Sequence, residues 1–358
     1  MLYVIVAILI FGVLIATHEL GHFATAKALG VKVNEFSVGM GPALLKRQKG
    51  ETLYSLRALP IGGYCAMEGE DDDSADPRSF GRAAGWKKVV ILCAGAAMNF
   101  LTGLVILLVI YSAASGFYRP VIGGFTEGFG LEDCGLQAGD VVVSVDGHRM
   151  YSYSNLEFFL TRAGDTVDWV VERDGQRVRL DGLYMPWQEA GVDESGQTIY
   201  QRGLQITRDV IPATPLVWLQ YSWYGALDFV RTVWISLGEL VSGAVGLRDL
   251  TGPVGIVDMM SEVGSDTQIS PTLADAARNL AMLASLIAVN LAVMNLLPRP
   301  ALDGGRIFFL LLNGVLYLLF RRRIDPRYEG YVHMAGLAAL MVLMLAVTLS
   351  DVGRLLGH

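Results

Sequence analysis

The sequence predicts a polytopic α-helical membrane protein with four transmembrane helices, an inserted α+β domain and a membrane-associated β-hairpin. Three observations support this fold class. The 358 residues are 53% apolar, with a mean hydropathy of +0.43. Apolar runs of about 18 residues or more, the length that crosses a bilayer, lie toward both ends of the chain. Between these runs, residues 115–208 regain charges and show the alternation that is typical of β-strands.

The composition also excludes several classes of protein. The net charge of −7 argues against a nucleic-acid partner. The three cysteines, Cys65, Cys93 and Cys134, are too few and too scattered for a disulfide framework or a cysteine-based zinc site. The N-terminus has no basic segment before its apolar run and no cleavage signal after it, which predicts a retained membrane span and not a signal peptide.

The first predicted span, residues 2–24, carries the sequence His18-Glu19-Leu20-Gly21-His22. Histidines four residues apart on a helix share one face and can bind one zinc ion together. Glu19 is then the candidate general base for a water molecule at the metal. Such a pair on a soluble helix could simply face solvent, but ionisable groups at a membrane span are costly unless they have partners.

Residues 1–114 form the first predicted domain: two transmembrane helices and, between them, a β-hairpin over residues 39–67 on the cytoplasmic side. Its strands are expected at 52–57 and 64–67, with the turn at 59–63. The segment is either an ordinary loop or an exposed strand edge that pairs with an extended substrate. The acidic residues after it, up to residue 76, lack the spacing of a calcium loop and are expected to be solvated.

The second predicted span, residues 89–111, contains two features of interest. Gly95, Ala96 and Ala97 are small enough for a neighbouring helix to approach closely. Asn99 needs a polar partner inside the membrane, and the proposed metal site could provide one.

Residues 115–208 are predicted to form an extracytoplasmic α+β domain. Strands are expected at 140–145 and 167–171, a helix at 153–161, and tight turns at the two Asp-Gly pairs, 146–147 and 174–175. The run Gly135-Leu136-Gln137-Ala138-Gly139-Asp140, followed by Val145-Asp146-Gly147, resembles a bacterial PDZ domain. His148, next to the first turn, is expected to be exposed.

Two further domains follow. Residues 209–275 are predicted to form amphipathic helices on the membrane surface, because charged residues recur at helical intervals in an apolar background. Residues 276–358 are predicted to contain the last two transmembrane helices, at 280–297 and 332–349. Residues 307–320 are short for a crossing, and the cluster Arg321–Arg323 follows them.

The distribution of charge predicts the topology. Lys27 and the cations after it follow the first span and none precedes it, which places the N-terminus outside. Four crossings then bring residues 18–22 and Asp303 to the cytoplasmic face together. A crossing by residues 212–250 would put Asp303 on the opposite side, and a crossing by residues 307–320 would place the arginine cluster outside.

Asp303 is the best candidate for a third zinc ligand. It follows the third span in the sequence Asn295-Leu296-Leu297-Pro298-Arg299-Pro300-Ala301-Leu302-Asp303-Gly304-Gly305. A catalytic zinc usually has three protein ligands and one open position. The alternative role for Asp303 is to cap the helix that follows. With Glu19 as base, the three ligands predict hydrolysis of peptide bonds at the membrane.

These motifs together resemble the site-2 protease family, and within it the bacterial regulator-of-sigma-E group with one PDZ domain. The resemblance implies a multi-pass inner-membrane metalloprotease with Zn²⁺ on His18, His22 and Asp303 and with Glu19 as base. It further implies that Asn295, Pro298 and Pro300 hold substrate. The substrates of the family are transmembrane segments of single-span proteins such as anti-sigma factors or remnant signal peptides, cut in regulated intramembrane proteolysis. Two positions depart from the family pattern, Ala96 and Arg299.

Two other functions are compatible with parts of the sequence. An ion or proton transporter would line a path with Asn290 and the three candidate ligands, but it would need inverted repeats, and the sequence has none that we detect. A catalytically inactive scaffold would act through the PDZ-like domain, whose ligand the sequence does not identify. The intact His-Glu-x-x-His motif argues against a scaffold.

Overall fold

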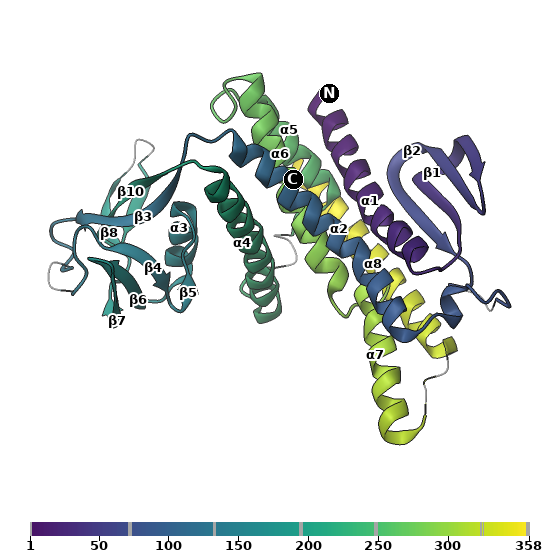
Figure 1. Cartoon of the computed structure of the whole chain (residues 1–358). Helices are drawn as coiled ribbons and strands as arrows, with labels where there is room; N and C mark the ends of the chain where they lie inside the picture. The colour runs from purple at the N-terminus through teal and green to yellow at the C-terminus, as the bar shows by residue number, and fades with distance from the viewer. Residues whose placement is uncertain are drawn as a thin grey trace. The chain divides into compact units, whose positions relative to one another are not determined.

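The computed structural model describes residues 2–70, 74–131, 134–192, 196–246, 250–322, 324 and 326–355. The chain forms two compact units (Figure 1), which we describe separately. The first unit combines Met1–Ile110 with Phe229–His358, and the second is Tyr111–Asp228. Asp71–Asp73 of the acidic run and Arg323 of the basic cluster lie outside the described residues.

The first unit is mostly helical, because a backbone in a membrane satisfies its hydrogen bonds within each helix. Its elements are α1 (Leu2–Ala28), β1 (Val33–Lys49), β2 (Thr52–Met67), the 3₁₀ helix η1 (Phe80–Arg82), α2 (Gly85–Ser112), α5 (Pro253–Ser265), α6 (Leu273–Leu296), α7 (Asp303–Phe320) and α8 (Pro326–Leu355). The boundary between the two units crosses α4 (Pro215–Ser242) and the end of α2.

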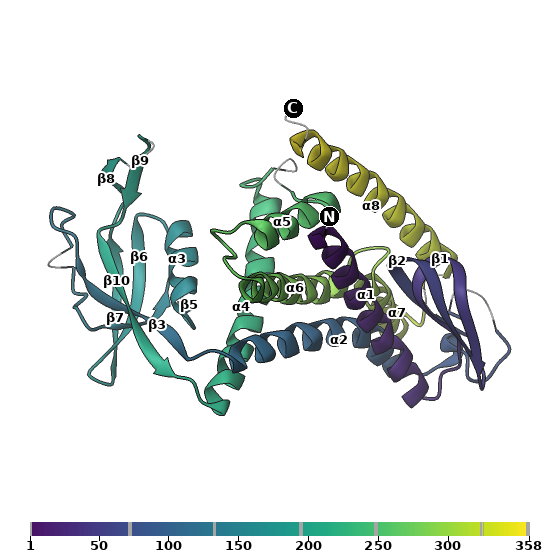
Figure 2. The same ribbon diagram turned by 90° about the horizontal axis from the view of Figure 1, so that it is seen from above.

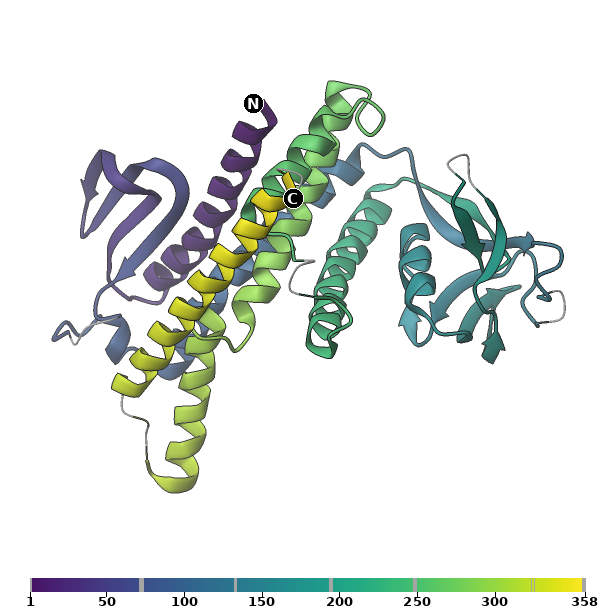
Figure 3. The ribbon, with the colours of Figure 1, turned by 180° about the vertical axis from the view of Figure 1, so that it is seen from behind.

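Small residues let the helices of the first unit pack closely. Gly103 of α2 faces α6, where an added methyl group would lie 2.9 Å from the Ser285 carbonyl oxygen. Ala7 of α1, Met260 of α5 and Leu280 of α6 are buried in one cluster. Figure 3 shows these helices from the side on which α8 lies in front. This packing fixes α1, which carries the two histidines, against α5 and α6.

Five helices in the described part of the chain are long and apolar enough to cross a membrane: α1, α2, α6, α7 and α8. One of the five, α7, was expected not to cross. It meets the test of length and composition because it begins at Asp303 and not at Ile307. The number of four crossings therefore stays a prediction. α4, predicted to lie on the membrane surface, is not among the five.

The β-hairpin forms, but the predicted position of its turn is wrong. The turn lies at Gly50–Glu51 and not at residues 59–63, and β1 begins before residue 39. A proline and two glycines at 59–63 suggested a turn, yet the segment continues β2 with an irregular register, because residues 59–67 pair with residues 33–40. The other side of residues 33–40 pairs with residues 53–56. Residues 59–67 are therefore an edge of this sheet.

The second unit is an α+β fold, as predicted for the inserted domain. Its sheet has the strand order β10-β3-β4-β6-β7, with β5 paired to β4. The strands β8 and β9 form a separate two-stranded sheet, which is labelled in Figure 2. The bounds are β3 (Gly116–Phe125), β4 (Val141–Val145), β5 (His148–Arg149), α3 (Tyr153–Arg162), β6 (Thr166–Arg173), β7 (Gln176–Tyr184), β8 (Gln188–Val192), β9 (Thr198–Gln201) and β10 (Leu204–Pro212).

Local predictions in this unit are confirmed. Asp146-Gly147 and Asp174-Gly175 all have positive φ, as the turn predicted at each Asp-Gly pair requires. The predicted helix corresponds to α3, and the two predicted strands correspond to β4 and β6. Trp169 of β6 is fully buried in the core. His148 is exposed, and its ring stacks on Phe159 with the centroids 4.6 Å apart.

Candidate metal centre

The two histidines of the motif lie on one face of α1, as their spacing requires. The Nε2 atoms of His18 and His22 are 3.1 Å apart. Gly21 lies between them, and a methyl group there would lie 2.3 Å from the carbonyl oxygen of Ala94. Only glycine allows α2 to come this close, so the imidazoles occupy a narrow space between α1 and α2.

Asp303 is the first residue of α7 and follows the loop at residues 297–302. A methyl group on Gly304 would lie 2.2 Å from the carbonyl oxygen of Leu297, and one on Gly305 would lie 2.2 Å from that of Arg299. The two glycines therefore let α7 begin close against the end of α6. The alternative role as a helix cap is wrong, because the N-cap residue of α7 is Leu302.

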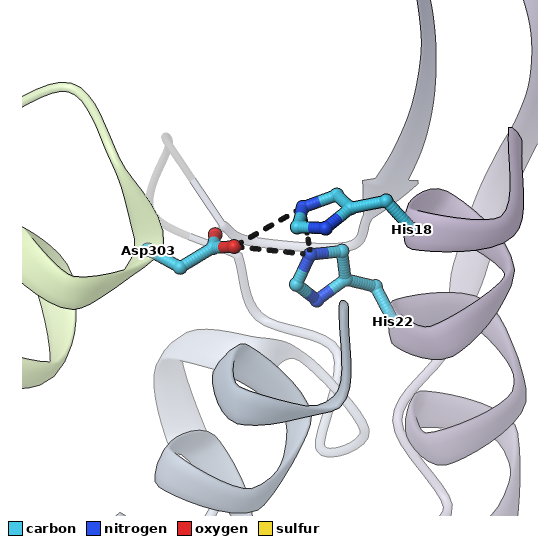
Figure 4. A group of neighbouring side chains, drawn as sticks. All are labelled: His18, His22 and Asp303. Atoms are coloured by element: carbon cyan, nitrogen blue, oxygen red, sulfur yellow. Dashed lines mark hydrogen bonds and ion pairs between the residues drawn. The ribbon is translucent and has the colours of Figure 1, made fainter. Parts of the chain in front are cut away.

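Three ligand atoms converge between α1 and α7 (Figure 4). Oδ2 of Asp303 lies 3.2 Å from Nε2 of His18 and 3.4 Å from Nε2 of His22. A tetrahedral zinc ion with bonds of about 2.0–2.1 Å holds its ligand atoms about 3.3 Å apart. Among the described residues, this group is the one set of three or more histidine, cysteine, aspartate or glutamate side chains spaced to hold a metal ion.

The outer nitrogen of each imidazole determines whether Nε2 is available to a metal. Nδ1 of His22 lies 2.9 Å from the carbonyl oxygen of Ile91 and donates its proton to it. That bond leaves a lone pair on Nε2. Nδ1 of His18 lies 3.4 Å from the amide nitrogens Nδ2 of Asn99 and Asn295. With the Asn295 amide turned by 180°, its oxygen accepts the proton of Nδ1 and leaves a lone pair on Nε2 of His18. Two imidazole lone pairs and a carboxylate then face one another, and this donor set fits a divalent cation.

Glu19 lies between the histidines and the hairpin. Its carboxylate accepts a hydrogen bond from the backbone N–H of Cys65, and its Cγ is 3.5 Å from where a methyl group on Gly63 would be. Burial raises the pKa of the Cys65 thiol to about 12, so this neighbouring thiol is neutral and is not a nucleophile. The carboxylate therefore lies beside the edge at residues 59–67, where a general base could meet an extended peptide.

The other predicted site residues have separate positions. Asn295 lies at the histidines, as described. Pro298 is exposed in the loop before Asp303, and Pro300 packs against Gly336 of α8. Asn290, which the transporter hypothesis needs, is exposed on α6.

Two residues at this centre were not singled out for it from the sequence. The first is Ile91, which contributes only its backbone carbonyl, so its side chain gives no signal. The second is Gly95, read simply as a small packing residue: a methyl group on it would lie 2.3 Å from Nε2 of His22 and 2.6 Å from Cε1 of His18. Gly95 thus makes the space in which both imidazoles sit, and the spacing Gly95-x-x-x-Asn99 placed it one helical turn from the polar residue of the same site.

The match to a known protein family includes the residues of this centre. Residues 6–343 match Peptidase family M50. A protein of Clostridium acetobutylicum, provisionally named a zinc metalloprotease, is 32% identical over 352 residues, which are 98% of this chain and 97% of that protein. The regulator of sigma-W protease RasP of Bacillus subtilis is 27% identical over an alignment of 439 residues, with 98% of each chain covered. The chain belongs to peptidase family M50.

Proposed function

We propose that this peptidase holds one zinc ion on His18, His22 and Asp303 and hydrolyses peptide bonds in membrane-embedded segments of single-span proteins. The observation that carries the proposal is the convergence of the three ligand atoms within 3.1–3.4 Å of one another. The names of its relatives as zinc metalloproteases support the choice of metal. When bound, zinc polarises the scissile carbonyl and lowers the pKa of water at the site to about 7.

The residues around the zinc ligands supply the remaining steps. Glu19 takes the proton from the attacking water and passes it to the leaving amine. Residues 59–67 form an edge strand beside Glu19, and a substrate unwound from its helix can pair with that edge. The amide of Asn295, together with Pro298 and Pro300, holds the unwound segment near the ligands.

The membrane arrangement is part of the proposal. Four crossings place residues 18–22 and Asp303 near the cytoplasmic face of the inner membrane, with the hairpin associated with the membrane there. Residues 115–208 act as an extracytoplasmic PDZ domain, and residues 209–275, which include α4 and α5, lie on the membrane surface. The substrates are transmembrane segments of anti-sigma factors or remnant signal peptides, and the name of the Bacillus subtilis relative, a regulator of sigma-W protease, supports the first of these.

Replacement of Glu19 tests the assignment of the general base. Glu19→Gln keeps the shape of the side chain but cannot take a proton, so we expect about one zinc per chain and loss of cleavage. The measurements are metal content by mass spectrometry and cleavage of a transmembrane-segment substrate in detergent. Glu127→Gln, on an exposed residue, is the control and should change neither. Cleavage that persisted in Glu19→Gln would remove Glu19 from the mechanism.

Replacement of Asp303 tests the ligand set. Asp303→Ala removes one of three ligands, so we expect the zinc affinity to fall by at least about tenfold, because an outer-shell partner alone costs a factor of about 10 to 100. The affinity is measured by competition with a chelator, without any substrate. Unchanged affinity would show that the metal is held elsewhere.

A further inference from the structure

Ala301, two residues before Asp303, has an unusual backbone conformation. Four non-glycine residues in the described chain have positive φ: Asp146, Asp174, Arg321 and Ala301. The two aspartates belong to Asp-Gly turns, and Arg321 closes α7. Ala301, at φ +71°, has no polar side chain to stabilise this left-handed conformation, so contacts from outside the residue must maintain it.

His333 of α8 provides such a contact. The backbone N–H of Ala301 donates a hydrogen bond to Nδ1 of His333 over 3.0 Å. Because Nδ1 accepts, the ring proton is on Nε2, which lies 4.0 Å from Oε1 of Glu329, one helical turn earlier. The neighbouring residues Pro298 and Pro300 have no N–H to donate, so Ala301 carries one of the few donors of this loop.

The same face of α8 touches the loop at a second point. Gly336 is three residues from His333, and a methyl group on it would lie 2.1 Å from Cβ of Pro300. Most residues of α8 are exposed in the described chain. A helix with so few buried residues is positioned by its few specific contacts. The contact with the loop lies directly before Asp303, a candidate metal ligand.

We propose that His333 is a positioning residue of the metal centre. By accepting the Ala301 N–H, it holds the loop in the conformation that directs Asp303 toward His18 and His22. The inference rests on the proposed function, in which Asp303 binds zinc. His333 itself is not a ligand in this assignment: it acts on the ligand through the backbone of residues 301–303. Its ring also lies close to Gly305, where an added methyl group would be 3.2 Å from Cε1 of His333.

Two substitutions separate the hydrogen bond from the packing of the ring, whose centroid is 5.7 Å from that of Phe309. His333→Phe keeps an aromatic ring but removes the acceptor. His333→Asn loses the ring but places an amide oxygen close to the position of Nδ1. The full-length protein is purified in detergent, and the affinity for zinc alone is measured by chelator competition, with the thermal midpoint recorded in parallel. His148→Phe, on an exposed histidine, is the matched control.

We expect His333→Phe to lower the zinc affinity by about 10- to 100-fold, the range for outer-shell partners of metal ligands. His333→Asn should restore most of that affinity, and His148→Phe should leave it unchanged. Affinity kept in the Phe variant and lost in the Asn variant would assign His333 to packing of its ring and overturn the inference. Equal losses in the two variants would overturn it too, because a restored acceptor would then not restore the loop. If Asp303→Ala kept full affinity, the proposed ligand set would fail first.

Hydrogen exchange of the unsubstituted protein gives a second test, which holds even if the Phe variant does not fold. The Ala301 amide should exchange slowly, because its hydrogen is bonded to His333. Rapid exchange of this amide in the zinc-loaded protein would overturn the inference. Slow exchange that became fast in His333→Phe and stayed slow in His333→Asn would support it.

Discussion

The geometry at the histidines depends on residues that have no side chain to contribute. His18 and His22 approach each other and α2 only because Gly21 and Gly95 leave room, and the carbonyl of Ile91 fixes the proton of His22 on the far side of the ring. The meeting of the two imidazoles was predictable, since a spacing of four on a helix places both on one face. The space around them was not predictable, because it depends on how closely two helices pack.

Gly95→Ala tests this dependence on space. The added methyl group would lie 2.3 Å from Nε2 of His22, so the ring must move away from its ligand position. We expect the zinc affinity to fall on the order of tenfold, measured by chelator competition. Gly85→Ala, in the same helix with no atom within 4 Å of the added methyl group, should keep the affinity of the unsubstituted protein. An unchanged affinity in Gly95→Ala would mean that the helices separate at no cost.

At the scale of elements, the turns show where sequence patterns predict the structure and where they fail. The turns at Asp146 and Asp174 were predicted correctly, because Asp-Gly pairs adopt positive φ with little strain. The turn expected at residues 59–63 was wrong, because pairing of that segment with residues 33–40 overrides the local preference of its proline and glycines. The contact of His333 with Ala301 had no local signal at all, since an alanine rarely indicates a left-handed residue.

Charged and polar side chains outside the membrane spans hold the end of the hairpin. Glu68, directly after β2, accepts hydrogen bonds from Ser74, Asn34 and Lys32, and these lower its pKa from 4.5 to about 2. The nearby cation Lys32 also pairs with Asp76 at 3.3 Å. These contacts connect the hairpin to the segment that leads into α2, and so they help to keep residues 59–67 beside Glu19.

The lowered pKa of Glu68 predicts a pH dependence of stability. A carboxyl group whose pKa is lower in the folded state stabilises the fold above about pH 4.5, and this contribution is lost as the pH falls toward about 2. Glu68→Gln should therefore lower the thermal midpoint at pH 6–7 but make little difference near pH 2, when both proteins are compared in the same detergent. A difference that was equally large at both pH values would contradict the assignment.

At the scale of the whole molecule, the proposal requires distant segments to meet at one depth in the bilayer. α1 carries two of the proposed ligands and α7 carries the third, and 280 residues lie between His22 and Asp303 in the sequence. The parity of the crossings between them decides whether they can meet, which is why topology could be argued from charge alone. The apolar character of α7 leaves the number of crossings to be measured.

Labelling of single cysteines measures that topology in the full chain. After replacement of Cys65, Cys93 and Cys134, a cysteine is placed at one of three exposed positions: Arg82, Arg177 or Arg299. Arg82 lies before α2 and Arg299 before α7, so the shared site requires both on the cytoplasmic side, where a membrane-impermeant maleimide reacts only after permeabilisation. Arg177→Cys, in the PDZ-like unit, should react in intact cells. Because the ligands on α1 and α7 can share one ion only if their ends lie at one face, labelling of positions 82 and 299 from opposite sides would exclude the metal centre itself.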